Sequence, residues 1–291
     1  MTMRVLFVTP ELAPWVKSGG LGDVSAALPE ALRAEGADAR VLVPAYPALL
    51  DNFHDVRTVT DFTRMGGALA DARLLEARSA SGIPLYLIDC PEYYRRAGSA
   101  YQDASGRDWT DNALRFALLS RVAARLGEAQ SPLSWHPQII HCHDWPTGLT
   151  PAYLQYAQRT AAIVMTVHNL AFQGLYDAQL LDVLGLPRAA FSIEGVEYYG
   201  SISFLKAGLF FADRLTTVSE TYAREIQTEE LGCGLGGLLR RRRDRLSGIL
   251  NGIDATVWDP ATDPLIEARY DPDHLADKLT NKAALRRELG L

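Results

Sequence analysis

Short runs of apolar residues alternate along the chain with segments in which apolar residues recur every three or four positions. Residues 4–10, RVLFVTP, are nearly all apolar and include β-branched side chains, as in a strand buried on both faces. Residues 24–36 have helical spacing, with Asp23 placed to cap the start and Gly36 to end the helix. Residues 39–46, ARVLVPAY, predict a second buried strand. This alternation predicts βαβ units and a mostly parallel sheet.

The segment from residue 57 to residue 87 departs from that alternation. Residues 56–59, 72–79 and 83–90 have the composition of strands, but no helical segment separates them. Strands joined without a helix between them pair in the antiparallel direction, because a parallel pair needs a long crossover. We therefore expect hairpins in this segment, at an edge of the sheet.

Beyond residue 110 the strand and helix alternation returns. Strands are expected at 138–144, 161–169, 213–219 and 246–254, and helices at 110–128 and 203–212. The pattern predicts a Rossmann-like, doubly wound α/β sheet, whose ligands bind at the carboxyl ends of the strands. We assign residues 1–255 to one large domain. Residues 256–291, which begin with a Pro- and Asp-rich segment, are expected to be a linker and the start of a further domain.

Composition narrows the classes of function. The length of 291 residues suggests roughly two domains, at about 150 residues each. A net charge of −6 argues against a nucleic-acid or membrane surface. No apolar stretch reaches the ~18 residues of a membrane span, and no signal-peptide cleavage site is evident, so we expect a cytoplasmic protein. Cys90, Cys142 and Cys233 lie far apart without a CxxC pair, so neither a disulfide framework nor a zinc ribbon is expected.

The first candidate site is a glycine loop, KSGGLGD, which follows the first strand. Glycines can simply permit a tight turn from strand to helix. The loop also opens a helix, where free backbone amides and the helix dipole favour an anion. Lys17 would add a full positive charge beside Gly19 and Gly20. The pattern is neither GxGxxG nor a phosphate-binding P-loop, so generic dinucleotide and NTPase interpretations are not supported.

Two further strands end in polar side chains. In HCHDW, His141 and His143 share one face of a strand, and Asp144 follows at its end. A metal site would need more ligands than are evident, and a histidine here can also be part of the core, with Asp144 as a helix cap. In TVHN, His168 and Asn169 close the next strand, and the two side chains together offer donors and acceptors suited to hydroxyl groups.

Two other polar segments are more ambiguous. Residues 101–112, YQDASGRDWTDN, combine aromatic rings with carboxylates, a combination that suits sugar rings but that turns and helix caps also explain. The run from Arg240 to Arg243 is interpreted as the solvated end of a helix rather than as a binding site.

Several long motifs together resemble one known family. In chain order they are MRVLFVTPELAPWVKSGGLGDV, HCHDWPTGL, TVHNLAFQG, SFLKAGLFFADRLTTVSETYAREI and GILNGID followed by WDPATD. They resemble the bacterial glycogen synthase and plant starch synthase family, over the chain from residue 3 to its last residue. That resemblance implies a GT-B glycosyltransferase that moves glucose from ADP-glucose to an α-1,4-glucan with retention of configuration. It implies no metal and no cofactor.

The resemblance implies roles on the donor side. Lys17 would contact the diphosphate or the sugar of the donor. Gly19 and Gly20 would bring backbone amides to the transferred glucose and to the phosphate. Asp23, a candidate catalytic residue, would hold the loop and bind hydroxyls. Asn251 would close the donor pocket near the hinge between the two domains of the family.

It implies further roles at the reacting centre and for the acceptor. His168 would face the transferred sugar, with its backbone carbonyl near the anomeric carbon, and Asn169 would lie beside it; both are candidate catalytic residues. Tyr101, Asp144 and Trp145 would shape the acceptor cleft.

The family has two Rossmann-like domains, and the sequence matches the first, on the acceptor side. We therefore expect this chain to show little or no glucosyl transfer by itself, because the second domain supplies cations that hold the diphosphate. The alternatives are a glucan-binding module that is inactive alone, or a GT-B transferase that uses another nucleotide sugar.

Overall fold

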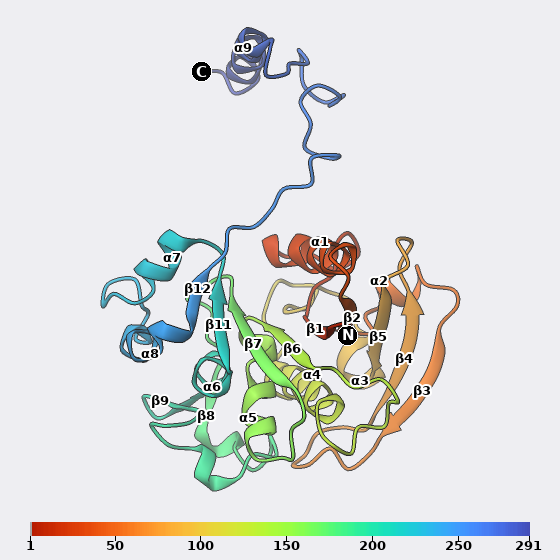
Figure 1. The fold of residues 1–291 in the computed structure, drawn as a ribbon, viewed down its shortest axis with the longest axis vertical. Coiled ribbons are helices and arrows are strands. Elements are labelled where there is room, and N and C mark those ends of the chain that lie inside the picture. Colours follow the sequence, from red (N-terminus) through yellow and green to blue (C-terminus); the bar gives the residue numbers. More distant parts are fainter. Residues whose placement is uncertain (1) are drawn as a thin grey trace. The chain divides into compact units, whose positions relative to one another are not determined.

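The computed structural model describes residues 2–291 and consists of two units, one ending at Leu250 and one covering Asn251–Leu291. The first unit is built on a nine-stranded sheet with the strand order β12-β11-β7-β6-β1-β2-β5-β4-β3 (Figure 1). Its strands are β1 (Arg4–Val8), β2 (Asp38–Pro44), β3 (Arg57–Phe62), β4 (Ala72–Arg78), β5 (Pro84–Asp89), β6 (Ile139–His143), β7 (Ala162–Val167), β11 (Arg214–Thr217) and β12 (Leu246–Gly248).

Pairing within this sheet confirms both sequence predictions. Every neighbouring pair from β12 to β5 is parallel, whereas β4 runs antiparallel to both β5 and β3. The antiparallel strands lie at one edge of the sheet (Figure 1). The segment without helices therefore forms the expected edge hairpins, and the rest forms the expected mostly parallel α/β sheet.

Most helices of the first unit lie between successive parallel strands. The helices of this unit are α1 (Gly20–Ala34), α2 (Pro47–Leu50), α3 (Pro91–Tyr94), α4 (Asn112–Leu126), α5 (Leu149–Gln155), α6 (Phe204–Phe211), α7 (Glu220–Glu225) and α8 (Gly236–Arg241). Of these, α2 follows β2 and leads to the edge strand β3. The chain leaves β1 through α1 toward β2, but leaves β6 through α5 in the opposite direction toward β7. Right-handed crossovers in opposite directions place α1 on one face and the packed row α4, α5 and α6 on the other (Figure 1).

A smaller antiparallel sheet, absent from the sequence prediction, has the order β8-β10-β9. Its strands are β8 (Leu175–Asp177), β9 (Glu197–Tyr198) and β10 (Ser201–Ser203). They are two or three residues long, too short to show the alternation by which strands are recognised. Antiparallel pairs connect β10 to both of its neighbours.

Of two expectations about helix ends, one is wrong and the other holds for Arg240, Arg241 and Arg243, which are exposed at or just after the end of α8. Asp23 does not cap α1, because the helix begins earlier, after the N-cap Gly19, and Asp23 lies in its first turn. Arg242, from the arginine run, is half-buried and is not simply solvated: its guanidinium donates to the carbonyls of Leu209, Phe210 and Ala212, at the end of α6. Gly36 follows the end of α1 as predicted, with a positive φ of 89°.

The second unit carries one α-helix, α9 (Lys278–Glu288). No residue from Asn251 to Leu291 is buried, so this unit has no core of its own. Asn251, expected to close a donor pocket, is the first residue of this unit and is exposed; its role stays a prediction. In residues 2–291, no helix is long and apolar enough to cross a membrane.

Candidate active site

The candidate residues gather where the sheet changes its winding direction, between β1 and β6. These neighbouring strands are parallel, so the glycine loop after β1 and the HD segment after β6 leave the sheet at the same edge. β7 is parallel to β6 and brings His168 to that edge as well. In doubly wound sheets this is the position of the ligand-binding crevice.

Glu11, a residue that the sequence analysis did not select, holds the glycine loop. Its carboxylate is buried and its Oε2 accepts hydrogen bonds from the amides of Ser18 at 2.7 Å and Gly19 at 3.3 Å. The Gly19 amide is therefore engaged inside the protein, whereas Gly20 is exposed and opens α1. A side chain at Gly22 would come within 3.0 Å of the Lys17 side chain and 3.3 Å of the same carboxylate oxygen, so glycine there allows a close approach of helix and loop.

Lys17 and Asp23 pair with each other in this structure. Lys17 Nζ lies 2.8 Å from a carboxylate oxygen of Asp23, and both side chains are about half exposed. The pair places the cation at the mouth of the glycine loop in contact with solvent. A ligand with a stronger negative charge could replace Asp23 as the partner, since an exposed ion pair is worth only about 0–1 kcal/mol.

Glu11 also connects the glycine loop to the candidate acceptor residue Tyr101. The Tyr101 hydroxyl donates to Glu11 Oε1 at 2.7 Å. Burial, with Glu11 close by, raises the pKa of Tyr101 well above its usual value, so the hydroxyl stays protonated and remains a donor. The Tyr101 ring lies 6.2 Å from the ring of Trp145, centroid to centroid. Residues 101–112, which we call the tyrosine loop, are thus joined at one place to the glycine loop and to the segment after β6.

The Asp144 side chain contacts the turn after β7 rather than the helix that follows Asp144. Its carboxylate does not cap the short 3-10 helix Trp145–Thr147, but accepts hydrogen bonds from the backbone amides of His168 at 2.7 Å and Asn169 at 3.4 Å. Its backbone has a φ of 54° and a ψ of −177°, a strained conformation for a residue with a side chain. Burial raises the pKa of Asp144 to about 7, although the two amides oppose the rise.

Three histidine rings lie in a row beside the contact of Asp144 with the His168 and Asn169 amides; His143 is buried, and His141 and His168 are half-buried. His143 Nδ1 and His168 Nε2 are hydrogen-bonded at 3.0 Å. The rings of His141 and His143 lie 4.1 Å apart on one face of β6, as the strand alternation predicts. His141 Nε2 bonds the Thr166 hydroxyl at 2.6 Å, which makes it part of the core. Burial lowers the pKa of His141 to about 3 and that of His168 to about 4, so these rings are neutral near pH 7.

Trp145 packs mainly inside the domain. Its ring makes an edge contact with Phe116, with centroids 4.8 Å apart, and a side chain at Gly174 would come within 2.4 Å of it. Gly174 has a φ of +59°, so both its conformation and its close approach to Trp145 need a glycine. Trp145 therefore positions the surrounding loops, and part of it remains accessible.

A cavity of about 670 Å³ opens beside the glycine loop. Lys17 lines it together with Trp15, Tyr94, Arg96 and Trp109. The Arg96 guanidinium lies 5.1 Å from the centroid of the Trp109 ring and forms an ion pair with Asp111 at 2.6 Å. Part-exposed indole faces next to fixed guanidinium donors suit a ligand that has both flat apolar faces and many hydroxyl groups.

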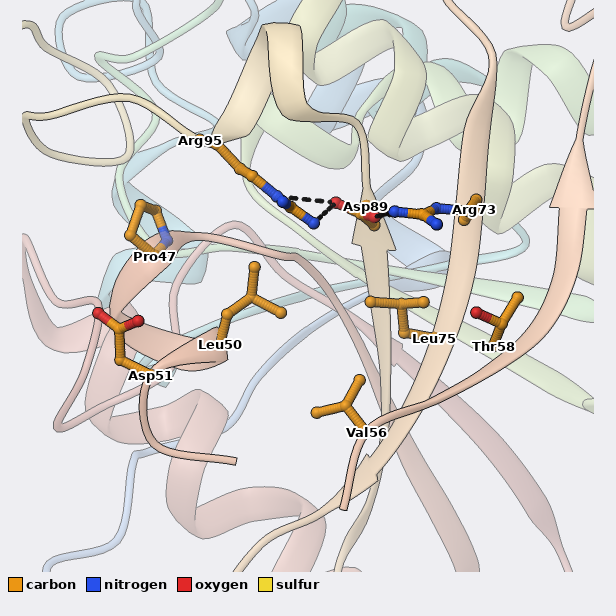
Figure 2. A pocket seen from close by; sticks show the side chains of 9 residues that line it. All are labelled: Pro47, Leu50, Asp51, Val56, Thr58, Arg73, Leu75, Asp89 and Arg95. Carbon is orange, nitrogen blue, oxygen red and sulfur yellow. Dashed lines mark hydrogen bonds and ion pairs between the residues drawn. The ribbon is translucent and has the colours of Figure 1, made fainter. Parts of the chain in front are cut away.

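A second cavity, of about 530 Å³, lies against the antiparallel edge of the sheet and contains none of the candidate residues (Figure 2). The fully buried carboxylate of Asp89 forms ion pairs with Arg73 at 2.5 Å and with Arg95 at 2.8 Å, one on each of its oxygens. Both arginines are directed to Asp89 from opposite sides (Figure 2). This network ties β4, β5 and the segment after α3 together, and we interpret it as structural.

Within residues 2–291, no three His, Cys, Asp or Glu side chains come together as a potential metal site.

Comparison with known proteins agrees with this arrangement. The family model for the starch synthase catalytic domain matches residues 4–241. The chain belongs to that family. It is 56% identical over 290 residues to a glycogen synthase of Aromatoleum aromaticum, covering 99% of this chain and 58% of that protein. It is 57% identical to a glycogen synthase of Dechloromonas aromatica, covering 100% of this chain and 59% of that protein.

A solved structure supports the family's fold. The catalytic domain of Starch Synthase IV from Arabidopsis thaliana, bound to ADP and acarbose, superposes with a TM-score of 0.79 at 32% identity. The match covers 100% of this chain and 60% of that one. The predicted fold class, a Rossmann-like sheet of the GT-B glycosyltransferase type, is confirmed. The chain thus spans somewhat less than two thirds of its relatives.

Within the first unit, the geometry brings most of the predicted residues of this family together. Backbone and side-chain contacts connect the glycine loop, Tyr101, Asp144 and His168 through Glu11 and the Trp145 ring. Asn169 lies next to His168, and its Oδ1 accepts the amide of Ala171 at 3.0 Å. Glu11 was missed, although an isolated carboxylate in the apolar segment VTPELAPWV is a signal that a buried partner must exist.

Proposed function

We propose that this chain forms the acceptor side of a glycogen synthase, which transfers glucose from ADP-glucose to the non-reducing end of an α-1,4-glucan with retention of configuration. The observation that carries the proposal is the connection, through Glu11, of the glycine loop to Tyr101, beside the clamp between Asp144 and His168. Supporting it, the relatives named glycogen synthase are 56% and 57% identical, and the similar starch synthase was solved with ADP and acarbose.

The glycine loop is proposed to receive the phosphates of the donor. Gly20 is exposed at the first position of α1, where backbone amides and the helix dipole favour a phosphate. Lys17 would exchange its exposed partner Asp23 for the diphosphate, and Asp23 would then be released to bind hydroxyl groups. Leaving-group charge develops on the diphosphate as the sugar departs, so a cation here stabilises the transition state more than the ground state.

His168 and Asn169 are proposed to hold the transferred glucose. The Asp144 carboxylate binds the amides of both residues, which fixes the direction of the backbone in the turn after β7. In this proposal the His168 carbonyl lies near the anomeric carbon, where it can stabilise developing positive charge. Asp144 acts through this backbone rather than by direct contact with the acceptor.

The acceptor glucan is proposed to enter along the cavity beside Tyr101. Trp15 and Trp109 supply part-exposed apolar faces, and Arg96 supplies donors for hydroxyl groups. We propose ADP-glucose as the donor and the cytoplasm as the location on the strength of the family, whose bacterial members are glycogen synthases.

A second candidate function is a glucan-binding module without transferase activity. The aromatic cavity is formed entirely by residues of the first unit, so glucan binding needs nothing beyond it. The glycine loop, in contrast, carries a single cation, Lys17, which is already paired. Loss of one charge-stabilising group can cost roughly a hundred- to a thousandfold in rate, so we expect binding with little turnover from the 291-residue chain.

The test combines a binding and a turnover assay on the purified chain. Retardation in native gels containing glycogen measures glucan binding, and a coupled assay of ADP release from ADP-glucose measures transfer. Trp109→Ala should weaken binding, whereas Trp258→Ala, at an exposed tryptophan of the second unit, should not. Turnover of about 10 per second would make the chain itself a transferase, whereas binding without turnover is expected both of an acceptor-side domain and of a binding module. A chain that shows no glucan binding and no turnover would contradict both functions.

A further inference from the structure

The hydrogen bond between His143 and His168 raises a question of proton placement. His143 is fully buried at the end of β6. Its ring stacks on Phe7 with centroids 4.0 Å apart and lies 4.1 Å from the ring of His141. Its Nδ1 lies 3.0 Å from Nε2 of His168. Contacts with the Phe7 and His141 rings hold the His143 ring in place, with its Nδ1 directed at His168.

Both rings are neutral near pH 7, because burial lowers the pKa of His168 to about 4 and that of His143 well below its usual value. A neutral imidazole carries one N–H and one lone pair. The bond can therefore be made in two ways. Either His143 donates from Nδ1 to Nε2 of His168, or His168 donates from Nε2 to Nδ1 of His143.

The far nitrogen of His143 distinguishes the two arrangements. His143 Nε2 is enclosed and has no hydrogen-bond partner among the residues that the structure describes. If His168 were the donor, the proton of His143 would be on this nitrogen as a buried N–H without an acceptor. If His143 is the donor, only a lone pair is left there. Buried N–H groups without partners are the rarer of the two in proteins, so the arrangement in which His143 donates to His168 is favoured.

We infer that His143 is a positioning residue that fixes His168 in the tautomer with its proton on Nδ1. His168 Nδ1 has no partner among residues 2–291 and, unlike His143 Nε2, it is not enclosed. It therefore offers an N–H donor, and no lone pair, to a bound ligand. The matching ligand atom is an oxygen with a free lone pair, such as a sugar hydroxyl or a phosphate oxygen. In this tautomer Nδ1 cannot act as a general base.

This inference rests on the proposed function only for the identity of the ligand, and it is tested without any ligand. The chain is prepared with ¹⁵N-labelled histidine, and long-range ¹H–¹⁵N correlation spectra show which ring nitrogen of each histidine is protonated. His168 and His143 are assigned by their loss in single variants. We expect both residues to be protonated on Nδ1. A wild-type spectrum with the His168 proton on Nε2 would overturn the inference.

Two variants separate positioning from simple packing. His143→Asn keeps an amide N–H near the position of Nδ1 and should leave the His168 tautomer unchanged. His143→Leu keeps an apolar side chain against Phe7 but removes the donor. We expect a larger fraction of His168 in this variant than in the wild type to carry its proton on Nε2. An unchanged His168 tautomer in a folded His143→Leu chain would contradict the role of His143. Should that variant not fold, the wild-type and His143→Asn spectra still decide.

A separate measurement on the same labelled chain tests the proposed function. Adding ADP-glucose or maltoheptaose to the labelled chain should shift the His168 Nδ1–H resonance if His168 faces the substrates. If His168 has the expected tautomer but its Nδ1–H resonance does not shift on adding either substrate, the role of His143 stands and the result counts against the proposed function alone.

Discussion

Glu11 is the residue on which two loops of the site depend. One carboxylate oxygen accepts the amides of Ser18 and Gly19, and the other accepts the hydroxyl of Tyr101. Because the carboxylate is buried, each group that it binds would be left without a partner if the side chain were removed. A single residue therefore sets the position of the glycine loop and of the tyrosine loop.

Replacement of Glu11 by alanine should destabilise the first unit. We expect a loss of about 1.5–3 kcal/mol in the free energy of unfolding, the value for a hydrogen bond to a charged group. Urea unfolding measures the loss. Glu30→Ala, at an exposed glutamate of α1 without side-chain bonds, is the matched control and should change stability little. Equal stability of the two variants would show that Glu11 does not hold the loops.

Replacement of Asp144 by asparagine should change how stability depends on pH. The pKa of Asp144 in the folded chain, about 7, lies above its ordinary value of 3.8. Between these values the folded chain keeps a proton that the unfolded chain has released, so rising pH lowers the contribution of Asp144 to stability. Asparagine does not titrate, yet keeps an oxygen that can accept the His168 amide.

Asp144→Asn should therefore gain stability relative to the wild type as the pH rises. The difference should grow by up to roughly 1.4 kcal/mol per pH unit between the two pKa values and stay constant above the higher one. Urea unfolding of both proteins over a pH series measures it. The buried histidines are common to both proteins and cancel in the difference. A difference independent of pH would mean that the Asp144 carboxyl is not perturbed by burial.

Replacement of Lys17 by alanine should leave the fold intact and weaken donor binding. The ion pair with Asp23 is half exposed, so its loss should cost no more than about 1 kcal/mol. Thermal unfolding measures that cost, and calorimetric titration with ADP measures the loss of affinity. Arg33→Ala, near the other end of α1, serves as a control for loss of charge. A large fall in the melting temperature would show that Lys17 has a structural role, and unchanged ADP affinity would show that it does not serve as a phosphate ligand.

At the scale of elements, the sequence predicted the strands better than their connections. β1 and β7 are buried on both faces, and their continuous apolar runs reveal them directly. The role of Asp144 could not be predicted, because it depends on a positive φ and on an amide that follows the neighbouring strand β7. The bond between Glu11 and Tyr101 joins residues 90 positions apart, and nothing local in either segment specifies it.

The contact between the start of α5 and α6 depends on a glycine. A side chain at Gly148 would come within 2.0 Å of the carbonyl oxygen of Phe204, a backbone atom that cannot move away alone. Gly148→Ala should therefore destabilise the first unit by about 1–3 kcal/mol, as overpacking does. Gly237→Ala in α8 meets only the far end of Arg240 at 4.0 Å and should be neutral or stabilising. Thermal unfolding compares the two; equal melting temperatures would contradict the close packing of α5 on α6.

At the scale of the whole molecule, the two units differ in what stabilises them. The first unit contains the core, including fully buried residues of β1, β2, β5, β6 and β7. The second has no buried residue, and side chains such as Trp258 and Leu265 are exposed by 70% and 91%. Burial of apolar surface is the main source of folding free energy, so the stability of the chain resides in the first unit.

Removal of residues 251–291 should therefore leave the unfolding of the first unit unchanged. The last strand, β12, ends at Gly248 and pairs with β11, and the amide of Ile249 still donates to the carbonyl of Thr217 at 2.8 Å, so a chain ending at Leu250 keeps the whole sheet. Urea unfolding should give the same midpoint and the same slope, because the slope reports the surface exposed on unfolding. A chain ending at residue 245 is the control: it lacks β12, exposes the edge of β11 and should unfold at lower urea. A clear loss of stability on removing residues 251–291 alone would show that the second unit contributes to the core after all.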